Sequence, residues 1–254
     1  MAQILALAMQ KGGVGKTTTT LNLGVNLARS GAKVLLVDID PQANLTSGLG
    51  IDPESLEYSV YEVLLNPEHG SDFATVVTNA GVDLIPSSLA LAGAELELAG
   101  KVGRETLLRK ALKQTANKKY DYILIDPPPS LGTFTLNALV AANSILVPLQ
   151  VHVYALKAMP QLQATIDLVL DLNPGLAISG IVPTFHDKRT NLSLAVEQQI
   201  RETYGELVFK TPIPLNTKLA ESPAAGQPIH SYAPDSTAAK AYEALAQEVR
   251  ERYG

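Results

Sequence analysis

Short apolar runs alternate along the chain with longer segments in which apolar residues recur every three or four positions. Several of the short runs are almost continuous in Ile, Leu and Val, which is typical of strands buried on both faces. The predicted strands are Ile4–Met9, Lys33–Val37, Val82–Ile85, Tyr122–Ile125, Ser144–Pro148, Ala177–Val182 and Leu207–Thr211. The predicted helices are Thr17–Arg29, Arg104–Asn117, Thr133–Ala142, Ala155–Leu172, Leu192–Tyr204 and Ser236–Arg252.

Strands that alternate with helices of this length predict an α/β fold, a mostly parallel twisted β-sheet with helices on both faces. Asp52–Gly81 is the least regular segment, with Pro53, Pro67 and Gly70, and we interpret it as an excursion from the fold. The sequence has no internal repeat and no linker-like stretch. We therefore predict one domain spanning residues 1–254.

Composition narrows the class of protein. Of the 254 residues, 46% are hydrophobic and 18% are charged, which excludes a disordered chain. The net charge of −5 gives no general attraction to nucleic acid or membrane, although a local basic patch can still provide one. The absence of cysteine excludes disulfides and thiolate chemistry. With neither an export signal nor a membrane-length apolar run, we expect a soluble, cytoplasmic protein.

A glycine-rich loop directly follows the first predicted strand and opens a helix. It contains Gly12, Gly13, Val14, Gly15, Lys16, Thr17 and Thr18. Glycines allow backbone N–H groups to turn inward, and the helix N-terminus adds positive partial charge. In such a P-loop the lysine reaches the β- and γ-phosphates and the next hydroxyl ligates Mg²⁺, which predicts these roles for Lys16 and Thr17. A ligand-free turn is the alternative, but the Gly-Lys-Thr-Thr continuation disfavours it.

The loop departs from the common phosphate-binding pattern at its start. Gln10 stands where that pattern has glycine, and a second lysine, Lys11, follows it. One loop cannot easily aim two lysines at the same nucleotide. Lys11 is therefore either an ordinary exposed lysine or a charge supplied to a second subunit's nucleotide, as an arginine finger is.

Carboxylates follow two other predicted strands. Asp38 and Asp40 come at the end of Lys33–Val37, and Asp126 comes at the end of Tyr122–Ile125. The carboxyl ends of parallel strands are where α/β proteins bind ligands. Asp40 can orient the attacking water, and Asp126 has the Walker B position that holds Mg²⁺ directly or through water. Turn formation is the alternative explanation for the first pair.

Taken together, these blocks resemble the ParA/MinD family of deviant Walker A ATPases, and most closely its short Soj-type members. The matching blocks begin at Lys11, Leu36, Leu124, Asp187 and Ile213, in the family's order and over essentially the whole chain. The resemblance implies ATP and Mg²⁺ as cofactors and a face-to-face homodimer. In that dimer Lys11 touches the partner's nucleotide and Gly12 lies at the close approach of the subunits. Pro214 and Asn216 match positions that hold the adenine.

The same resemblance implies non-specific binding of the ATP dimer to double-stranded DNA, a nucleoid-associated location, and a ParB-like partner that stimulates a weak ATPase. Arg189 matches a basic DNA contact of the family. Lys218 stands where relatives carry arginine, and Leu215 replaces another typical arginine. On sequence alone, Arg189 and Lys218 also fit ordinary solvated charge.

Three alternatives stay open at this point: a nucleoid-bound ATPase that positions a protein cargo, a MinD-like membrane switch, and a metabolic enzyme on the same scaffold. Lys11 favours DNA partition over protein positioning, because some positioning relatives lack it. The C-terminal segment Ser236–Arg252 has mixed charge and few bulky apolar residues, which favours a packing helix over a membrane anchor. We therefore expect no membrane partner.

Overall fold

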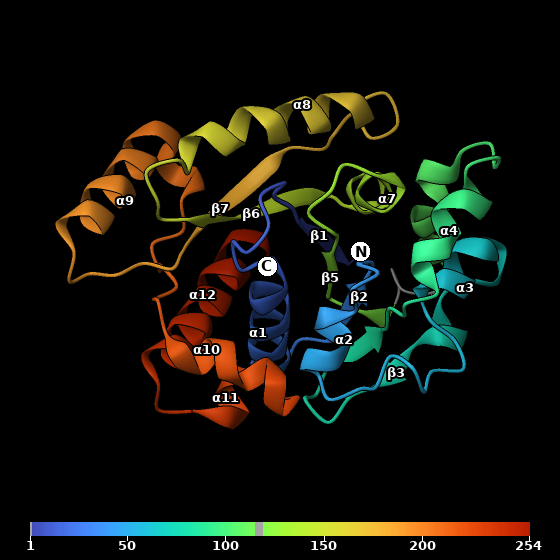
Figure 1. Cartoon of the computed structure of the whole chain (residues 1–254), viewed down its shortest axis with the longest axis horizontal. Coiled ribbons are helices and arrows are strands. Elements are labelled where there is room, and N and C mark those ends of the chain that lie inside the picture. Colours follow the sequence, from blue (N-terminus) through green and yellow to red (C-terminus); the bar gives the residue numbers. More distant parts are fainter. Residues whose placement is uncertain (1, 115–118) are drawn as a thin grey trace.

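The computed structural model describes residues 2–114 and 119–254. Within them a seven-stranded sheet has the order β3-β4-β2-β5-β1-β6-β7 (Figure 1). Its strands are β1 (Gln3–Leu7), β2 (Val34–Asp38), β3 (Val76–Val77), β4 (Asp83–Ile85), β5 (Tyr122–Asp126), β6 (Ser144–Gln150) and β7 (Ile178–Thr184). Every strand pairing is parallel except that of β3 with β4. The predicted α/β class is confirmed.

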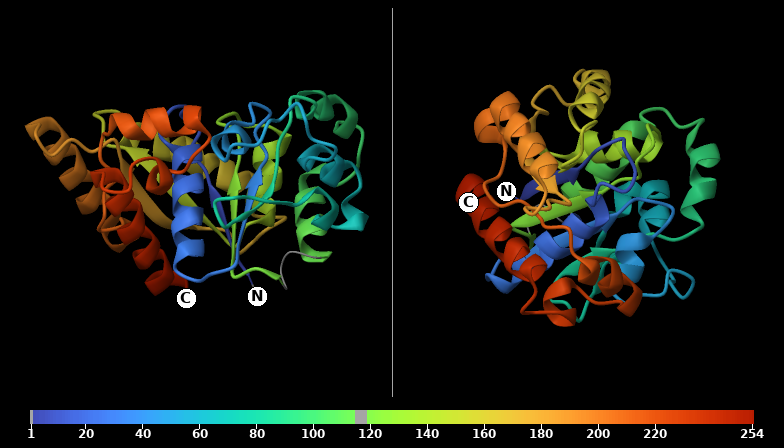
Figure 2. Two further views of the ribbon diagram at one scale, coloured as in Figure 1. Left: turned by 90° about the horizontal axis from the view of Figure 1, so that it is seen from below. Right: turned by 60° about the vertical axis from the view of Figure 1, so that its left-hand side comes forward.

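Helices cover both faces of the sheet (Figures 1 and 2). One face carries α1 (Lys16–Arg29), α2 (Asn44–Gly48), α10 (Thr217–Glu221), α11 (Ile229–Tyr232) and α12 (Thr237–Tyr253). The other carries α3 (Val60–Leu65), α4 (Leu91–Leu98), α5 (Leu107–Gln114), α7 (Thr133–Ala141), α8 (Met159–Val169) and α9 (Asn191–Tyr204). Among the described residues, no helix is long and apolar enough to cross a membrane.

Alternate residues of each central strand pack into opposite cores. In β1, Leu5 and Leu7 face α1 and α12, whereas Ile4 and Ala6 face the other layer. β5 lies between β1 and β2 and is buried throughout. Both faces of these strands are therefore apolar, which is why the sequence shows continuous runs without polar alternation.

One predicted strand is wrong. Leu207–Thr211 makes a single bridge, from Val208 to Ile181 of β7, and begins in a 3₁₀ turn, Gly205–Leu207. The amides of Lys210 and Thr211 donate to the carboxylate of Glu248 in α12, at 2.7 and 2.8 Å. Because a side chain satisfies these amides, no neighbouring strand is needed and the ladder ends.

Two predicted helices begin with a 3₁₀ turn, so their α-helical parts are shorter than the predicted segments. Arg104–Asn117 begins with the 3₁₀ turn Arg104–Thr106 and continues as α5 to Gln114, and its last three residues lie outside the described residues. Ala155–Leu172 contains the 3₁₀ turn Leu156–Ala158 before α8 begins. The irregular segment 52–81 contains α3 and β3. α3 begins at a capping box in which Ser59 and Glu62 satisfy each other's backbone N–H groups.

Candidate nucleotide site

The predicted phosphate loop joins β1 to α1. Gly13 and Gly15 have left-handed φ angles of 70° and 89°, which side chains rarely adopt. Gly15 is the N-cap of α1, and no side chain caps the helix. The backbone N–H groups of the first turn therefore lack a side-chain acceptor, as an anion site requires.

Lys16 stands at the first position of α1 and is only 7% exposed. Burial lowers its pKa, and the charges of Asp126 and then Asp40 act in the opposite direction. Since burying a lone ammonium is costly, the two carboxylates stabilise its charged form. The structure thus brings together one lysine and two aspartates that the sequence predicted from three separate motifs.

Asp126 ends β5 and is buried. Its Oδ1 accepts a hydrogen bond from Thr20 Oγ1 at 3.2 Å, whereas its buried Oδ2 has no hydrogen-bond partner among the described residues. Burial raises the pKa of Asp126 to about 6, and the Thr17 hydroxyl and the Lys16 charge oppose this shift. A free carboxylate oxygen beside a threonine hydroxyl is a donor set that fits Mg²⁺, a cation that prefers oxygen ligands.

The segment after β2 carries two aspartates in different environments. Asp40 is 9% exposed, and its Oδ1 accepts from the amide of Gln42 at 2.9 Å. Asp38 is fully buried, lies beside Asp126 in the parallel register of β2 and β5, and hydrogen-bonds to Thr46 and to the amide of Asp40. Burial and the neighbouring Asp126 raise the pKa of Asp38 to about 8. Asp40 is therefore the more accessible of the two.

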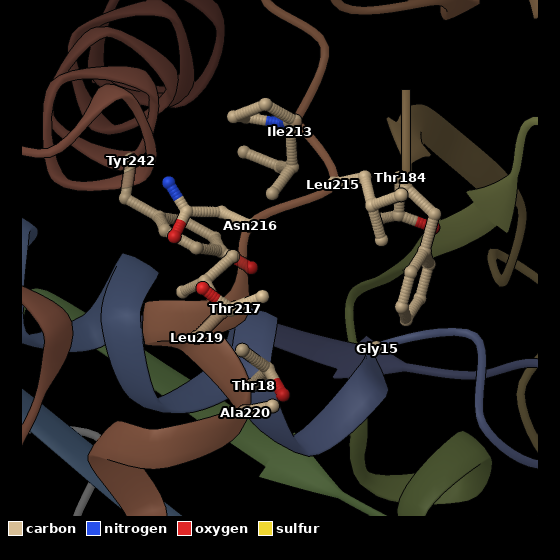
Figure 3. Close-up of a pocket in the computed structure, with 12 residues that line it drawn as sticks. Gly15, Thr18, Thr184, Ile213, Leu215, Asn216, Thr217, Leu219, Ala220 and Tyr242 are labelled. Atoms are coloured by element: carbon tan, nitrogen blue, oxygen red, sulfur yellow. The ribbon is translucent and has the colours of Figure 1, made fainter. Parts of the chain in front are cut away.

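Two cavities meet at the phosphate loop, and Gly15 and Thr18 line both of them. The first, of about 500 Å³, is also lined by Lys16 and Thr17 and by Asn44 of α2. The second, of about 340 Å³ and mainly apolar, is lined by residues of the loop 213–217 and by Tyr242 of α12 (Figure 3). The first, which we call the polar cavity because Lys16 and threonine hydroxyls line it, has the chemistry to hold phosphates, and the apolar cavity can hold a planar base.

Pro214 and Asn216 both line the apolar cavity, as the adenine prediction requires. Asn216 Oδ1 caps α10 by accepting from the amide of Lys218 at 2.9 Å, and its Nδ2 donates to Thr237 Oγ1 at 3.2 Å. These bonds fix the side chain at the cavity wall (Figure 3). Its amide would have to share these partners in order to bind a base.

Lys11, Gly12 and Gly13 are exposed at the start of the loop. Lys11 Nζ donates to Gln150 Oε1 at the end of β6, at 3.0 Å. A Cβ added to Gly12 would meet nothing within 4 Å among the described residues. Val14, in contrast, is buried, and its carbonyl oxygen accepts from Thr184 Oγ1 at 2.8 Å. Within one chain nothing requires glycine at position 12 for space.

The two predicted DNA contacts are exposed and ion-paired. Arg189 forms a bidentate pair with Asp187, both bonds at 2.8 Å, which holds the pKa of that carboxyl down at about 2. Lys218 Nζ lies 2.8 Å from Glu221 Oε2. The segments that carry them are joined where the amide of His186 donates to the Ile213 carbonyl and the amide of Leu215 donates to the His186 carbonyl. Exposed pairs of this kind contribute little to stability and can exchange partners.

A family model described as an AAA domain matches residues 2–178. Over 250 residues the chain is 46% identical to the sporulation initiation inhibitor protein Soj of Bacillus subtilis, covering 98% of each chain. The chain belongs to the Soj/ParA family. It is also 48% identical to the chromosome-partitioning ATPase Soj of Thermus thermophilus, covering 98% of this chain and 95% of the relative.

A solved structure from Mycobacterium smegmatis is similar to this Soj/ParA chain in fold. Its TM-score is 0.85 at 40% identity, and the match covers 99% of this chain and 95% of the other. That structure is named cobyrinic acid a,c-diamide synthase and contains an ATP analogue and magnesium. The predicted P-loop ATPase fold is therefore confirmed.

Two residues of the site in this Soj/ParA protein were not predicted from the sequence. Phe185 lines the apolar cavity with a left-handed φ of 54°, and its ring packs 3.5 Å from where a Cβ on Gly15 would lie. Tyr242 is buried, lines the same cavity, and shares a 3.2 Å hydrogen bond with Thr19 of α1. Neither position has a local signal, because both act through contacts distant in sequence.

Proposed function

We propose that this chain is a partition ATPase whose ATP-bound homodimer binds double-stranded DNA without sequence preference. Hydrolysis, stimulated by a ParB-like protein, then releases the DNA, and repeated cycles segregate a chromosome or plasmid on the nucleoid. What carries the proposal is the convergence of Lys16, Asp40 and Asp126 at the carboxyl ends of three neighbouring strands, beside a glycine loop. Identity over nearly the whole chain to relatives named for chromosome partitioning, from Myxococcus xanthus and Thermus thermophilus, supports it.

Each residue has a role in this proposal. The amides of the phosphate loop and Lys16 bind the phosphates, and Thr18 bonds the α-phosphate. Thr17 and Asp126 hold Mg²⁺, which when bound neutralises charge on the β- and γ-phosphate oxygens. Asp40 accepts a hydrogen bond from the attacking water and orients this water toward the γ-phosphate. The base lies in the apolar cavity against Pro214, near Asn216.

In the proposed dimer, each subunit supplies one further group, Lys11, to the site of its partner. Lys11 is exposed at the start of the phosphate loop, and within the described residues its one hydrogen-bond partner is the neutral Gln150, so its charge is free to reach a nucleotide held by a second subunit. Gly12 beside it leaves open space in one chain, which a partner's backbone can fill. We therefore propose that two chains meet face to face over their nucleotides.

Binding of the purified chain to random-sequence duplex DNA tests this function. We expect binding with ATP, none with ADP or without nucleotide, and weakening as salt rises, because phosphate contacts release counterions. Lys16→Ala should abolish it, and Lys110→Ala, at an exposed position of α5, is the matched control. An equal affinity in all three nucleotide states would contradict the proposal.

The name of the M. smegmatis structure would instead imply ATP-dependent formation of an amide. We favour partition, because relatives named for chromosome partitioning are more similar, at 43% and 48% identity. The two functions differ in which added molecules increase the rate of ATP turnover. Cobyrinic acid with an ammonia donor should have no effect on turnover, whereas DNA and a ParB-like protein should increase it.

A further inference from the structure

Three hydrogen bonds hold the backbone of Asp40. One comes from the same turn, where the carbonyl oxygen of Asp40 accepts from the amide of Ala43 at 2.9 Å. The other two hold Asp40 from opposite sides. Its amide donates to Asp38 Oδ1 at 3.2 Å, and its carbonyl oxygen accepts from Ser87 Oγ at 2.7 Å. Ser87 follows β4 and is fully buried. The peptide groups on either side of Asp40 are therefore fixed by two different segments of the chain.

Thr46 joins these two segments. Its amide and its Oγ1 both donate to Asp38 Oδ2, at 2.9 and 2.8 Å, and its Oγ1 also accepts from the amide of Ser87 at 3.0 Å. Thr46 is fully buried in α2, so its hydroxyl is both donor and acceptor without water. Asp38, Thr46 and Ser87 form a closed network around Asp40, and we call this network the Asp40 clamp.

We infer that Thr46 and Ser87 are positioning residues for the hydrolytic step, acting through Asp40. The inference rests on the proposed function, in which Asp40 orients the attacking water. The only hydrogen bond the Asp40 carboxylate makes within the described residues is to the amide of Gln42, in the same turn. The position of this carboxylate is therefore set by the backbone of Asp40, which the clamp holds.

The clamp also reaches the nucleotide cavity through α2. Asn44, Ser47 and Gly48 of this helix line the polar cavity, and Thr46 lies between them. A single hydroxyl thus fixes α2 relative to the strand that carries Asp38 and to the loop that carries Ser87. Because misplacing a catalytic group by 1 Å costs about 100-fold in rate, loss of this hydroxyl should affect turnover more than binding.

Thr46→Val and Thr46→Ser test the inference. Valine has the shape of threonine without the hydroxyl, and serine restores it. We expect Thr46→Val to bind an ATP analogue with Mg²⁺ within about threefold of wild type but to turn over about 10- to 100-fold more slowly. Thr46→Ser should recover most of the rate, and Ser87→Ala should show the same split between binding and turnover as Thr46→Val.

Thr78→Val is the matched control. Thr78 is also buried, and its Oγ1 donates to the Val82 carbonyl at 2.7 Å, far from Asp40 in the β3–β4 connection. Both valine variants lose a buried hydroxyl, so both should have a lower thermal unfolding midpoint, but Thr78→Val should keep wild-type turnover.

Two results would overturn the inference alone. One is wild-type turnover in Thr46→Val, and the other is an equal loss of binding and turnover in Thr46→Val and Thr46→Ser, which is what a structural role predicts. A wild-type chain that binds ATP but never hydrolyses it, with or without DNA, would instead overturn the proposed ATPase, and the clamp with it.

Discussion

Thr184 at the end of β7 donates a hydrogen bond through Oγ1 to the carbonyl oxygen of Val14 across 2.8 Å. Both residues are buried, so this bond ties the phosphate loop to a strand on the far side of β6. Thr184→Val should lower the free energy of unfolding by about 1–3 kcal/mol, because the Val14 carbonyl loses its partner. Urea unfolding measures this, and Thr184→Ser should be close to wild type. A valine variant as stable as wild type would show that the bond contributes nothing.

Lys16→Ala should abolish ATP binding. The ammonium is buried between Asp126 and Asp40, so its loss removes the charge that faces the phosphates and leaves two carboxylates that repel them. Titration of a fluorescent ATP analogue measures the affinity. The phosphate-loop assignment fails if the variant binds as tightly as wild type.

Asp40→Ala should bind ATP, stop hydrolysis and accumulate dimer. Its carboxylate is 9% exposed and contributes no phosphate contact in our proposal, so binding should persist while the water loses its orienting group. Phosphate release and size-exclusion chromatography with ATP measure the two effects. Normal turnover would remove Asp40 from the mechanism.

Asp126 predicts a pH dependence for the nucleotide-free protein. Burial raises its pKa from 3.8 to about 6, so between these values the folded state binds more protons than the unfolded state. Stability contributed by this group is therefore present below about pH 4 and is lost as pH rises to about 6.

Asp126→Asn is the comparison, since asparagine keeps the acceptor for Thr20 but does not titrate. The free energy of unfolding of wild type minus that of the variant should fall by on the order of 2–3 kcal/mol between pH 4 and 7. It should fall further up to about pH 8, because the charge of Asp126 also raises the pKa of Asp38. Urea unfolding at each pH measures it. A difference that is constant with pH would mean that Asp126 keeps its ordinary pKa.

Charge at the loops 187–189 and 213–218 should set the salt dependence of DNA binding. Arg189→Ala should reduce the slope of log affinity against log salt by about 0.9, the loss of one phosphate contact. Leu215→Arg, at a position that is 58% exposed, should raise it by a similar amount. Lys110→Ala serves as the control, and an unchanged slope in Arg189→Ala would exclude that residue from the contact.

Most of the sheet could be predicted from the sequence, because strands such as Tyr122–Asp126 are buried on both faces and carry an unbroken apolar signal. Leu207–Thr211 has the same local signal, yet Glu248 of α12 takes its amides. A local pattern reports which side chains prefer burial and cannot report which distant group satisfies a backbone N–H.

The same distinction between local signals and distant contacts applies to the residues of the site. The phosphate loop, Asp40 and Asp126 each have a local motif that follows a strand, so their roles could be predicted and their meeting inferred from parallel strands. Thr46 and Ser87 have no motif, and their place beside Asp40 depends on how α2 and the end of β4 pack.

The position of β5 has a consequence for how the chain is made. β1 and β2 are not paired with each other, and both are held through β5, in registers such as Leu5 with Leu124 and Asp38 with Asp126. A ribosome-bound chain that ends before Tyr122 therefore carries the phosphate loop and Asp40 without the strand that joins them. We therefore expect the complete nucleotide site to form only after Asp126 has emerged from the ribosome.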